Sequence, residues 1–162
     1  NHLYAGGCRK VAFIGAHCES ESQHYRRKGF LNRCKELCIE ADVYLTRDED
    51  AKGEIDSLYE KLRQYQGLFA WNDSVAIELL HIFARNGCRI PQDIQMIGFD
   101  NTYIGSLFLP ALTTIAQNIP EIAAKTVECF AETQAGKTDS RNVFVDVQLI
   151  QRATTIGEHR AT

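Results

Sequence analysis

The chain has 162 residues, of which 44% are hydrophobic and 24% are charged, so its size and composition are those of one ordinary globular domain. Its formal net charge of -3 argues against a nucleic-acid surface on this segment, because such surfaces are usually basic. No apolar run approaches the roughly 18 residues that a membrane-spanning helix needs, so no membrane segment is predicted.

Short apolar runs alternate with helical patterns along the chain. The apolar runs predict strands at 10–15, 42–46, 67–71, 94–99, 112–116 and 142–150. Helical spacing predicts helices at 22–38, 53–64, 74–86 and 120–135. Ser22 is expected to cap the first of these helices, and Gly87 and Gly136 to end the last two. The alternation predicts an α/β fold, in which a parallel sheet carries helices on both faces and forms a three-layer unit.

Six cysteines are scattered along the chain without any Cys-x-x-Cys pair. Cys34 and Cys38 share a helical face, and His17, Cys18 and His24 lie near one another in sequence, so a zinc site is conceivable. The stronger prediction is that the cysteines are reduced and serve as small apolar residues, with no metal or cofactor. This usage indicates a reducing cytoplasm. The chain does not begin with methionine, and we expect it to be part of a longer protein.

Polar residues directly follow most of the predicted strands, at the edge where open parallel sheets bind ligands. These residues are Ala16-His17-Cys18, Arg47-Asp48-Glu49-Asp50, Asn72-Asp73, Asp100-Asn101 and Gln117-Asn118. We expect Asp100 to share one rim with Asn72 and Gln117 and to face a cleft. Local roles are the alternative: Asp73 as the N-cap of the following helix, and Asn72 or Asp100 in a turn.

Several sequence motifs of catalysis and nucleotide binding are missing. The chain contains no Gly-x-Gly-x-x-Gly, no Walker-type loop and no Gly-x-Ser-x-Gly elbow, so it is not expected to be an enzyme. A phosphoacceptor receiver domain is disfavoured, because the first strand ends in Gly15-Ala16-His17 and not in paired acidic residues. A rim of carboxylate and amides suits a polyhydroxylated or polar small molecule that is bound and not cleaved.

A set of motifs in fixed order resembles the lactose/galactose-repressor family of bacterial transcription regulators. The motifs are "IPQDIQMIGFDN" (90–101) and "PALTTIAQN" (110–118), supported by "GGCRKVAFIG" (6–15), "RRKGF" (26–30), "FAWNDSVA" (69–76) and "VQLIQRATT" (147–155). By motif position, the residues that match family effector contacts are Arg26, Asn72, Asp100 and Gln117. The chain departs from the family pattern at Cys8, Ala16-His17, Asp48 and Trp71. Trp71 can flank a sugar ring, but a core role is favoured.

The resemblance implies a particular domain organisation. Family members carry an N-terminal helix-turn-helix headpiece, a hinge and a two-lobed effector domain like periplasmic sugar-binding proteins. Residues 1–116 then form the C-terminal, periplasmic-binding-protein-like (type I) lobe, and 117–147 supply a helix and a strand to the N-terminal lobe. Residues 148–157 return to the C-terminal lobe, and 158–162 are a tail. Operator DNA would be bound only through the headpiece, which lies outside this segment.

The function implied by the resemblance is binding of a carbohydrate or similar effector by a cytoplasmic repressor. The alternative is an extracytoplasmic solute-binding protein that feeds a transporter. The unpaired cysteines and "PALTTIAQ" favour the repressor.

Two apolar surfaces are predicted to be covered by other parts of the protein. The helix 74–86 has an apolar arc of roughly 220°, too wide for one sheet to cover, and such a surface usually marks an interface. The predicted homodimer interface consists of Ile77, Leu80, His81, Ala84, Ile104, Leu107 and Phe108. The alternative is that the chain's own loop covers Ile77 and Leu80. The helix 120–135 is expected to pack on the first lobe through Ile122, Ala123, Val127, Phe130 and Ala131.

Overall fold

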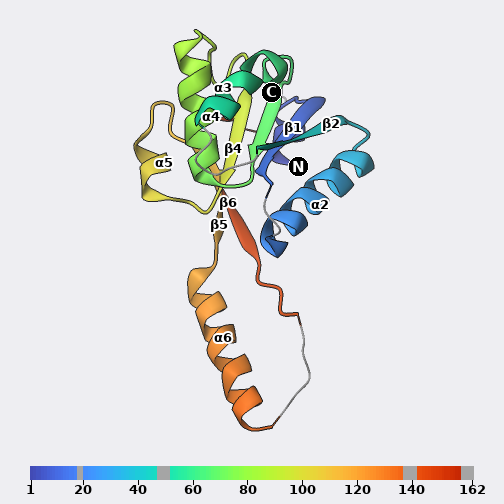
Figure 1. Ribbon diagram of the computed structural model, residues 1–162, viewed down its shortest axis with the longest axis vertical. Coiled ribbons are helices and arrows are strands. Elements are labelled where there is room, and N and C mark those ends of the chain that lie inside the picture. The colour runs from blue at the N-terminus through green and yellow to red at the C-terminus, as the bar shows by residue number, and fades with distance from the viewer. Residues whose placement is uncertain (18–19, 47–51, 137–141, 158–162) are drawn as a thin grey trace.

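The computed structural model (Figure 1) describes residues 1–17, 20–46, 52–136 and 142–157. The strands are β1 (Lys10–Ala16), β2 (Glu40–Thr46), β3 (Gly67–Ala70), β4 (Gln95–Phe99), β5 (Thr113–Gln117) and β6 (Val147–Ile150). The helices are α1 (His2–Ala5), α2 (Glu21–Glu36), α3 (Lys52–Leu62), α4 (Asp73–Arg85), α5 (Tyr103–Leu107) and α6 (Ile119–Gln134).

One six-stranded sheet organises the molecule, with the strand order β2-β1-β3-β4-β5-β6. Every neighbouring pair is parallel except β5 and β6, which run antiparallel. The predicted α/β fold with a mainly parallel sheet is therefore confirmed, and β6 is the exception. All five residues of β4 are buried, which is expected for a strand that is covered on both faces.

Helices cover the two faces of the sheet. On one face the ring of Phe13 in β1 lies 5.8 Å from the ring of Phe30 in α2. On the other face α4 packs against β3 and β4, and α3 packs against α4, where the rings of Tyr59 and Phe83 are 5.1 Å apart. The three predicted layers therefore form around the central strands β1, β3 and β4, whose side chains are mostly buried on both faces.

Several element boundaries differ from the prediction. The helix α2 begins at Glu21 after Ser20, so Ser22 is not its cap. The strand predicted at 142–150 is confined to Val147–Ile150. The short helix α5 was not predicted from the sequence. Gly87 and Gly136 do follow the ends of α4 and α6 with φ of 76° and 83°, as predicted.

The helix α6 projects away from the sheet, below it in Figure 1. None of its residues is buried. Val127 and Phe130 are 68% and 65% exposed, although both are apolar. The described residues of the chain therefore leave Val127 and Phe130 largely uncovered, whereas Ile122 and Cys129 of the same helix are partly buried.

No helix in the described part of the chain is long and apolar enough to cross a membrane. The same residues contain no cluster of three or more His, Cys, Asp or Glu side chains that is suitable for a metal ion. Five of the cysteines are free thiols, and Cys18 lies outside the described residues. Burial raises the pKa of the Cys8 thiol to about 11, so this cysteine is a protonated core residue at neutral pH.

Candidate functional site: a polar rim at the carboxyl ends of the strands

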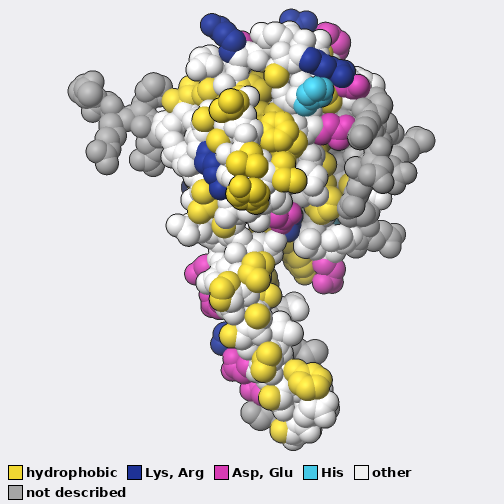
Figure 2. Space-filling view, turned by 90° about the vertical axis from the view of Figure 1, so that its left-hand side faces the viewer, with side chains coloured by type: hydrophobic (Ala, Val, Ile, Leu, Met, Phe, Trp, Pro, Cys, Tyr) yellow, Lys and Arg dark blue, Asp and Glu magenta, His cyan; other side chains and the backbone are white. Residues whose placement is uncertain are grey.

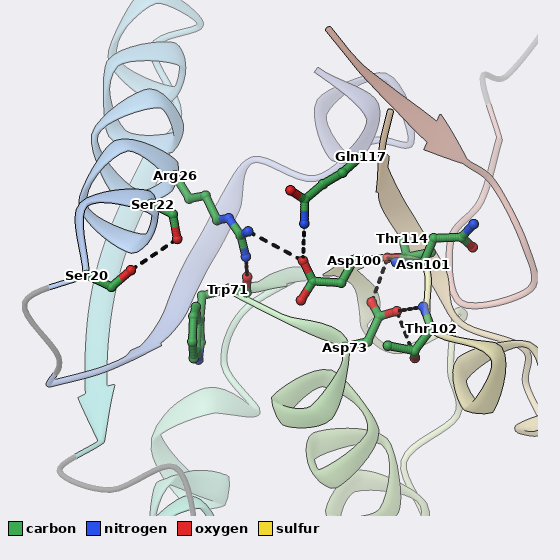
Figure 3. A network of polar contacts seen from close by, with 10 residues as sticks. All are labelled: Ser20, Ser22, Arg26, Trp71, Asp73, Asp100, Asn101, Thr102, Thr114 and Gln117. Atoms are coloured by element: carbon green, nitrogen blue, oxygen red, sulfur yellow. Dashed lines mark hydrogen bonds and ion pairs between the residues drawn. The ribbon is translucent and has the colours of Figure 1, made fainter. Parts of the chain in front are cut away.

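Asp100 follows the last residue of the buried strand β4 at the edge of the sheet (Figure 3). Its φ is 106° and that of Asn101 is 52°, so two consecutive residues with side chains adopt a left-handed backbone. The Asp100 amide donates to the Ile115 carbonyl at 2.8 Å, which ties this turn to the neighbouring strand β5. Such backbone strain is typical of sites where a side chain must point in one particular direction.

Arg26, in the second turn of α2, reaches the rim from the neighbouring helix (Figure 3). Its guanidinium carbon lies 3.6 Å from the centre of the Phe99 ring, and Nη1 donates to the Trp71 carbonyl at 2.5 Å. Nη2 is 3.4 Å from Asp100 Oδ1, which completes an ion pair. The side chain of Arg26 is only 13% exposed and that of Asp100 is 33% exposed. Arg26 is therefore fixed by three contacts before any ligand binds.

Gln117, the last residue of β5, donates from Nε2 to Asp100 Oδ1 at 2.8 Å. Burial raises the pKa of Asp100, although the charge of Arg26 and the hydrogen bond from Gln117 act in the opposite direction. Burial likewise lowers the pKa of Arg26, and the charge of Asp100 opposes this shift. The two charged groups thus partly offset the desolvation cost of each other.

The structure brings three of the four predicted ligand residues into direct contact, and these three are Arg26, Asp100 and Gln117. Asn72 lies beside Trp71, but its Oδ1 accepts the backbone N–H of Val75 at 2.9 Å and caps α4. Asn72 therefore does have a local role, but this role is to cap the helix and not to form the turn given as the alternative. The capping role predicted for Asp73 is wrong, because Asp73 is the first residue inside the helix.

A cleft of about 560 Å³ opens beside this rim. Its lining includes Arg26, Phe99 and Gln117 together with Lys125 and Thr126 of α6, whereas Asp100, which was expected to face a cleft, is not one of its lining residues. A second, apolar groove of about 370 Å³ lies between α1, α2 and the sheet, lined by residues such as Leu3, Val11 and Phe30. The first hollow has the charged and amide groups that a polar ligand needs, and the second has an apolar lining.

Sequence reasoning missed the residues that hold the rim from behind. Asp73 is fully buried and accepts hydrogen bonds from Thr102 and Thr114. Arg152 donates to Asn101 Oδ1 at 2.6 Å and to the Leu112 carbonyl at 2.7 Å. The available signal was the pair of threonines in "LTTIAQ", because a polar side chain in a buried strand requires a polar partner.

Trp71 belongs to the hydrophobic core, as favoured from the sequence, and is 9% exposed. Its indole Nε1 is buried and has no hydrogen-bond partner among the described residues. Cys8 is also a core residue, and His17 follows β1. Asp48, for which the family pattern was not matched, lies with its neighbours at 47–50 outside the described residues.

The predicted dimer surface is only partly exposed. His81 and Ala84 are exposed, as are Ile104 and Leu107 on α5, which are 59% and 62% exposed. Leu80 is only 3% exposed and belongs to the core. Figure 2 shows the apolar side chains that gather on this face of the molecule, above the projecting α6.

Leu80 is buried by other residues of the same chain, which was the alternative predicted for this helix. Ile77 and Phe108 are partly buried and pack against the same core cluster. Leu80 therefore cannot contribute to a free surface, and the apolar patch is centred on α5. The patch consists of Tyr103, Ile104, Leu107 and Leu109.

Comparison with known proteins places the chain in a family. Residues 1–155 match the family described as periplasmic binding protein-like domain. An HTH-type transcriptional repressor, PurR of Photobacterium profundum, is 31% identical over 150 residues, which cover 88% of this chain and 44% of that protein. The chain spans about half the length of the curated relatives it matches.

Two solved structures share the fold and carry a sugar. A periplasmic binding protein/LacI transcriptional regulator from Alkaliphilus metalliredigens QYMF, complexed with D-xylulofuranose, is 32% identical with a TM-score of 0.80, over 96% of this chain and 60% of that chain. A LacI family transcriptional regulator from Enterococcus faecium with bound ribose is 25% identical with a TM-score of 0.79, over 96% and 59%. These relatives confirm the predicted resemblance, and the chain belongs to the periplasmic binding protein-like domain family.

Proposed function

We propose that this chain is the effector-binding and dimerisation part of a bacterial transcriptional repressor, and that its effector is a sugar or a sugar-like molecule. The observation that carries the proposal is the convergence of Arg26 and Gln117 on Oδ1 of Asp100, at the carboxyl edge of a parallel sheet. This edge is where ligands bind in open α/β sheets. The proposed effector site also includes Asn72, which lies at the start of α4.

The chemistry of the rim favours a neutral polyhydroxylated ligand. A carboxylate accepts hydrogen bonds from hydroxyl groups, and Arg26 and Gln117 donate to hydroxyl oxygens. Because Arg26 and Asp100 are already paired, the rim is nearly neutral as a whole, and a strongly charged ligand would have to break that pair. The sugars bound by the two solved relatives support the same ligand class.

The division into lobes is part of the proposal. Residues 1–116 and 148–157 form the C-terminal lobe, and 117–147 belong to an N-terminal lobe whose remainder precedes this segment. The exposed apolar side of α6, with Val127 and Phe130, supports this division, because an isolated amphipathic helix requires a partner. Closure of the two lobes around the sugar would change the affinity of a headpiece for operator DNA.

The protein is proposed to act without catalysis or a cofactor, as a homodimer in the cytoplasm. Free thiols at the described cysteines support a reducing compartment. The alternative is an extracytoplasmic solute-binding protein of a sugar transporter. Reading the coding sequence before Asn1 separates the two, because a helix-turn-helix there supports the repressor and a signal peptide supports transport.

The proposed ligand class is tested on the full-length protein by isothermal titration calorimetry. The panel contains ribose, xylulose, galactose and lactose, with nucleosides, nucleobases and amino acids as other polar classes. We expect one sugar to bind at one molecule per chain and to change the affinity for operator DNA. Binding of a nucleobase or an amino acid with no response to any sugar would contradict the proposal.

A further inference from the structure

A buried carboxylate, that of Asp73, lies directly behind the rim (Figure 3). Its side chain is inaccessible to solvent. Oδ2 accepts hydrogen bonds from the backbone N–H and the hydroxyl of Thr102, at 2.6 Å and 3.0 Å. Oδ1 accepts from the hydroxyl of Thr114 at 2.6 Å. One side chain at the start of α4 thus joins the loop after β4 to the strand β5.

These bonds act on the left-handed turn that carries Asp100. The Asn101 backbone N–H donates to Oγ1 of Thr114 at 3.2 Å, and this same hydroxyl donates to Asp73. Thr102, the next residue, is bound to Asp73 through both its backbone and its side chain. Asp73 therefore holds Thr102 directly and holds Asn101 through Thr114. Asn101 has a φ of 52°, a left-handed backbone conformation that residues with side chains rarely adopt.

The role of Asp73 is distinct from helix capping. The cap of α4 is Asn72, whose Oδ1 binds Val75, so the Asp73 carboxylate is not needed for that purpose. Its partners Thr102 and Thr114 lie 29 and 41 residues away in sequence. A Cβ atom on Gly98 would lie too close to Oδ1 of Asp73, so a residue without a side chain leaves the space for this carboxylate.

We infer that Asp73 is a positioning residue of the effector site, which holds the strained Asp100–Asn101 turn so that Asp100 faces Arg26 and Gln117. The predicted effect on effector binding rests on the proposed function, whereas the predicted effect on the turn does not. Thr102 is also the N-cap of α5, because its hydroxyl accepts the Gly105 N–H at 3.4 Å. A shift of the turn would therefore also move the start of the helix that bears the exposed apolar patch.

The test uses two matched substitutions in the full-length protein. Thr114→Val removes a buried hydroxyl that donates to Asp73 and accepts from the Asn101 N–H. Thr154→Val is the control, because the Thr154 hydroxyl is equally buried, donates to the Met96 carbonyl at 2.7 Å and accepts from the Thr113 N–H at 2.8 Å. Both variants lose one donated and one accepted hydrogen bond, but only Thr114→Val removes a hydrogen bond to the Asp100–Asn101 turn.

The primary measurement is amide hydrogen exchange without ligand, under conditions where both variants are folded. Thr114→Val should accelerate exchange at Asn101 and Thr102 by at least about tenfold, and Thr154→Val should leave these two amides unchanged. Asp73→Asn should give the same pattern as Thr114→Val, because an amide replaces one carboxylate acceptor by a donor. Calorimetry with D-ribose should show about three- to tenfold weaker binding for Thr114→Val only.

The outcomes separate this inference from the proposed function. Equal acceleration at Asn101 and Thr102 in both threonine variants, or no acceleration in Thr114→Val, overturns the positioning role. Unchanged D-ribose affinity in Thr114→Val despite faster exchange overturns the link to the effector. If the wild-type protein binds none of the sugars in the panel while exchange follows the expected pattern, the proposed ligand class fails and the control of the turn by Asp73 stands.

Discussion

The guanidinium of Arg26 lies over the ring of Phe99, with 3.6 Å between the guanidinium carbon and the ring centre. Phe99 is the last residue of β4 and Asp100 follows it, so one strand end supplies both the surface on which Arg26 stacks and the carboxylate it meets. A stacked guanidinium keeps its planar donors aligned at little further loss of side-chain freedom. The aromatic residue therefore takes part in the geometry of the rim without contacting the effector through a polar group.

Replacing Phe99 by leucine should weaken effector binding, because it removes the stacking but keeps the apolar side chain. A cation–π contact of this kind contributes about 1 kcal/mol, which corresponds to roughly fivefold in affinity. Calorimetry with the bound sugar measures the change. Phe69→Leu is the control, since the Phe69 ring packs on Phe13 and Phe30 and not on Arg26. Equal losses in both variants would show that the effect arises from core packing alone.

Effector affinity should depend on pH through Asp100. Burial raises the pKa of this carboxyl above its ordinary value of 3.8, and only the ionised form accepts from both Arg26 and the effector. Affinity is therefore greatest at neutral pH and falls as the pH decreases through the raised pKa, by about tenfold per unit below it. Asp100→Asn should bind more weakly at pH 7 and show no such fall. An affinity in the wild-type protein that stays constant from pH 7 to below 3.8, the ordinary pKa of the carboxyl group, contradicts this prediction.

Two exposed glycines should respond to alanine in opposite directions. Gly87 has a φ of 76°, and a Cβ there meets no atom, so Gly87→Ala should destabilise the chain by about 1 kcal/mol through backbone strain alone. Gly29 lies inside α2, where a Cβ also meets no atom, so Gly29→Ala should stabilise by about 0.5–1 kcal/mol. Urea unfolding of both variants measures whether each substitution lowers or raises the free energy of unfolding. A destabilised Gly29→Ala would mean that this position is covered in solution.

The exposed patch on α5 should hold two copies of the protein together. Ile104→Asp combined with Leu107→Asp places charges in a surface that association would bury, so sedimentation should change from dimer to monomer. The matched control is Tyr25→Asp with Leu31→Asp on α2, where two other exposed apolar side chains change in the same way. A dimer that survives the first pair, or is disrupted equally by the second, places the interface elsewhere.

The central strands β1, β3 and β4 could be predicted because they are buried on both faces. Continuous apolar runs such as "KVAFIG" have few alternatives, and glycines such as Gly87 mark helix ends by their backbone freedom. The predicted extent of β6 was too long, because the apolar residues at 143–145 precede it without pairing in the sheet. Local sequence records apolar character but not whether a partner strand is present.

The rim residues were predictable as strand ends, but their support was not. Asn72 and Asp73 are adjacent and both favour helix starts, so local sequence does not decide which one caps α4. The partners of Asp73 are distant in sequence, and only the folded chain brings Thr102 and Thr114 to it. The burial of Leu80 was likewise not predictable from local sequence. Its helical position indicated exposure, whereas the fold places it in the core.

We expect the carboxylate of Asp100 to bind the effector, and calorimetry on the full-length protein measures its contribution. Asp100→Ala removes charge-assisted hydrogen bonds that contribute on the order of 1.5–3 kcal/mol each, so affinity for the bound sugar should fall at least ~10-fold. Asp93→Ala is the control, because Asp93 forms an exposed ion pair with Arg89 outside the rim. Its affinity should match the wild type. An unchanged affinity in Asp100→Ala would falsify the assignment of this rim as the effector site.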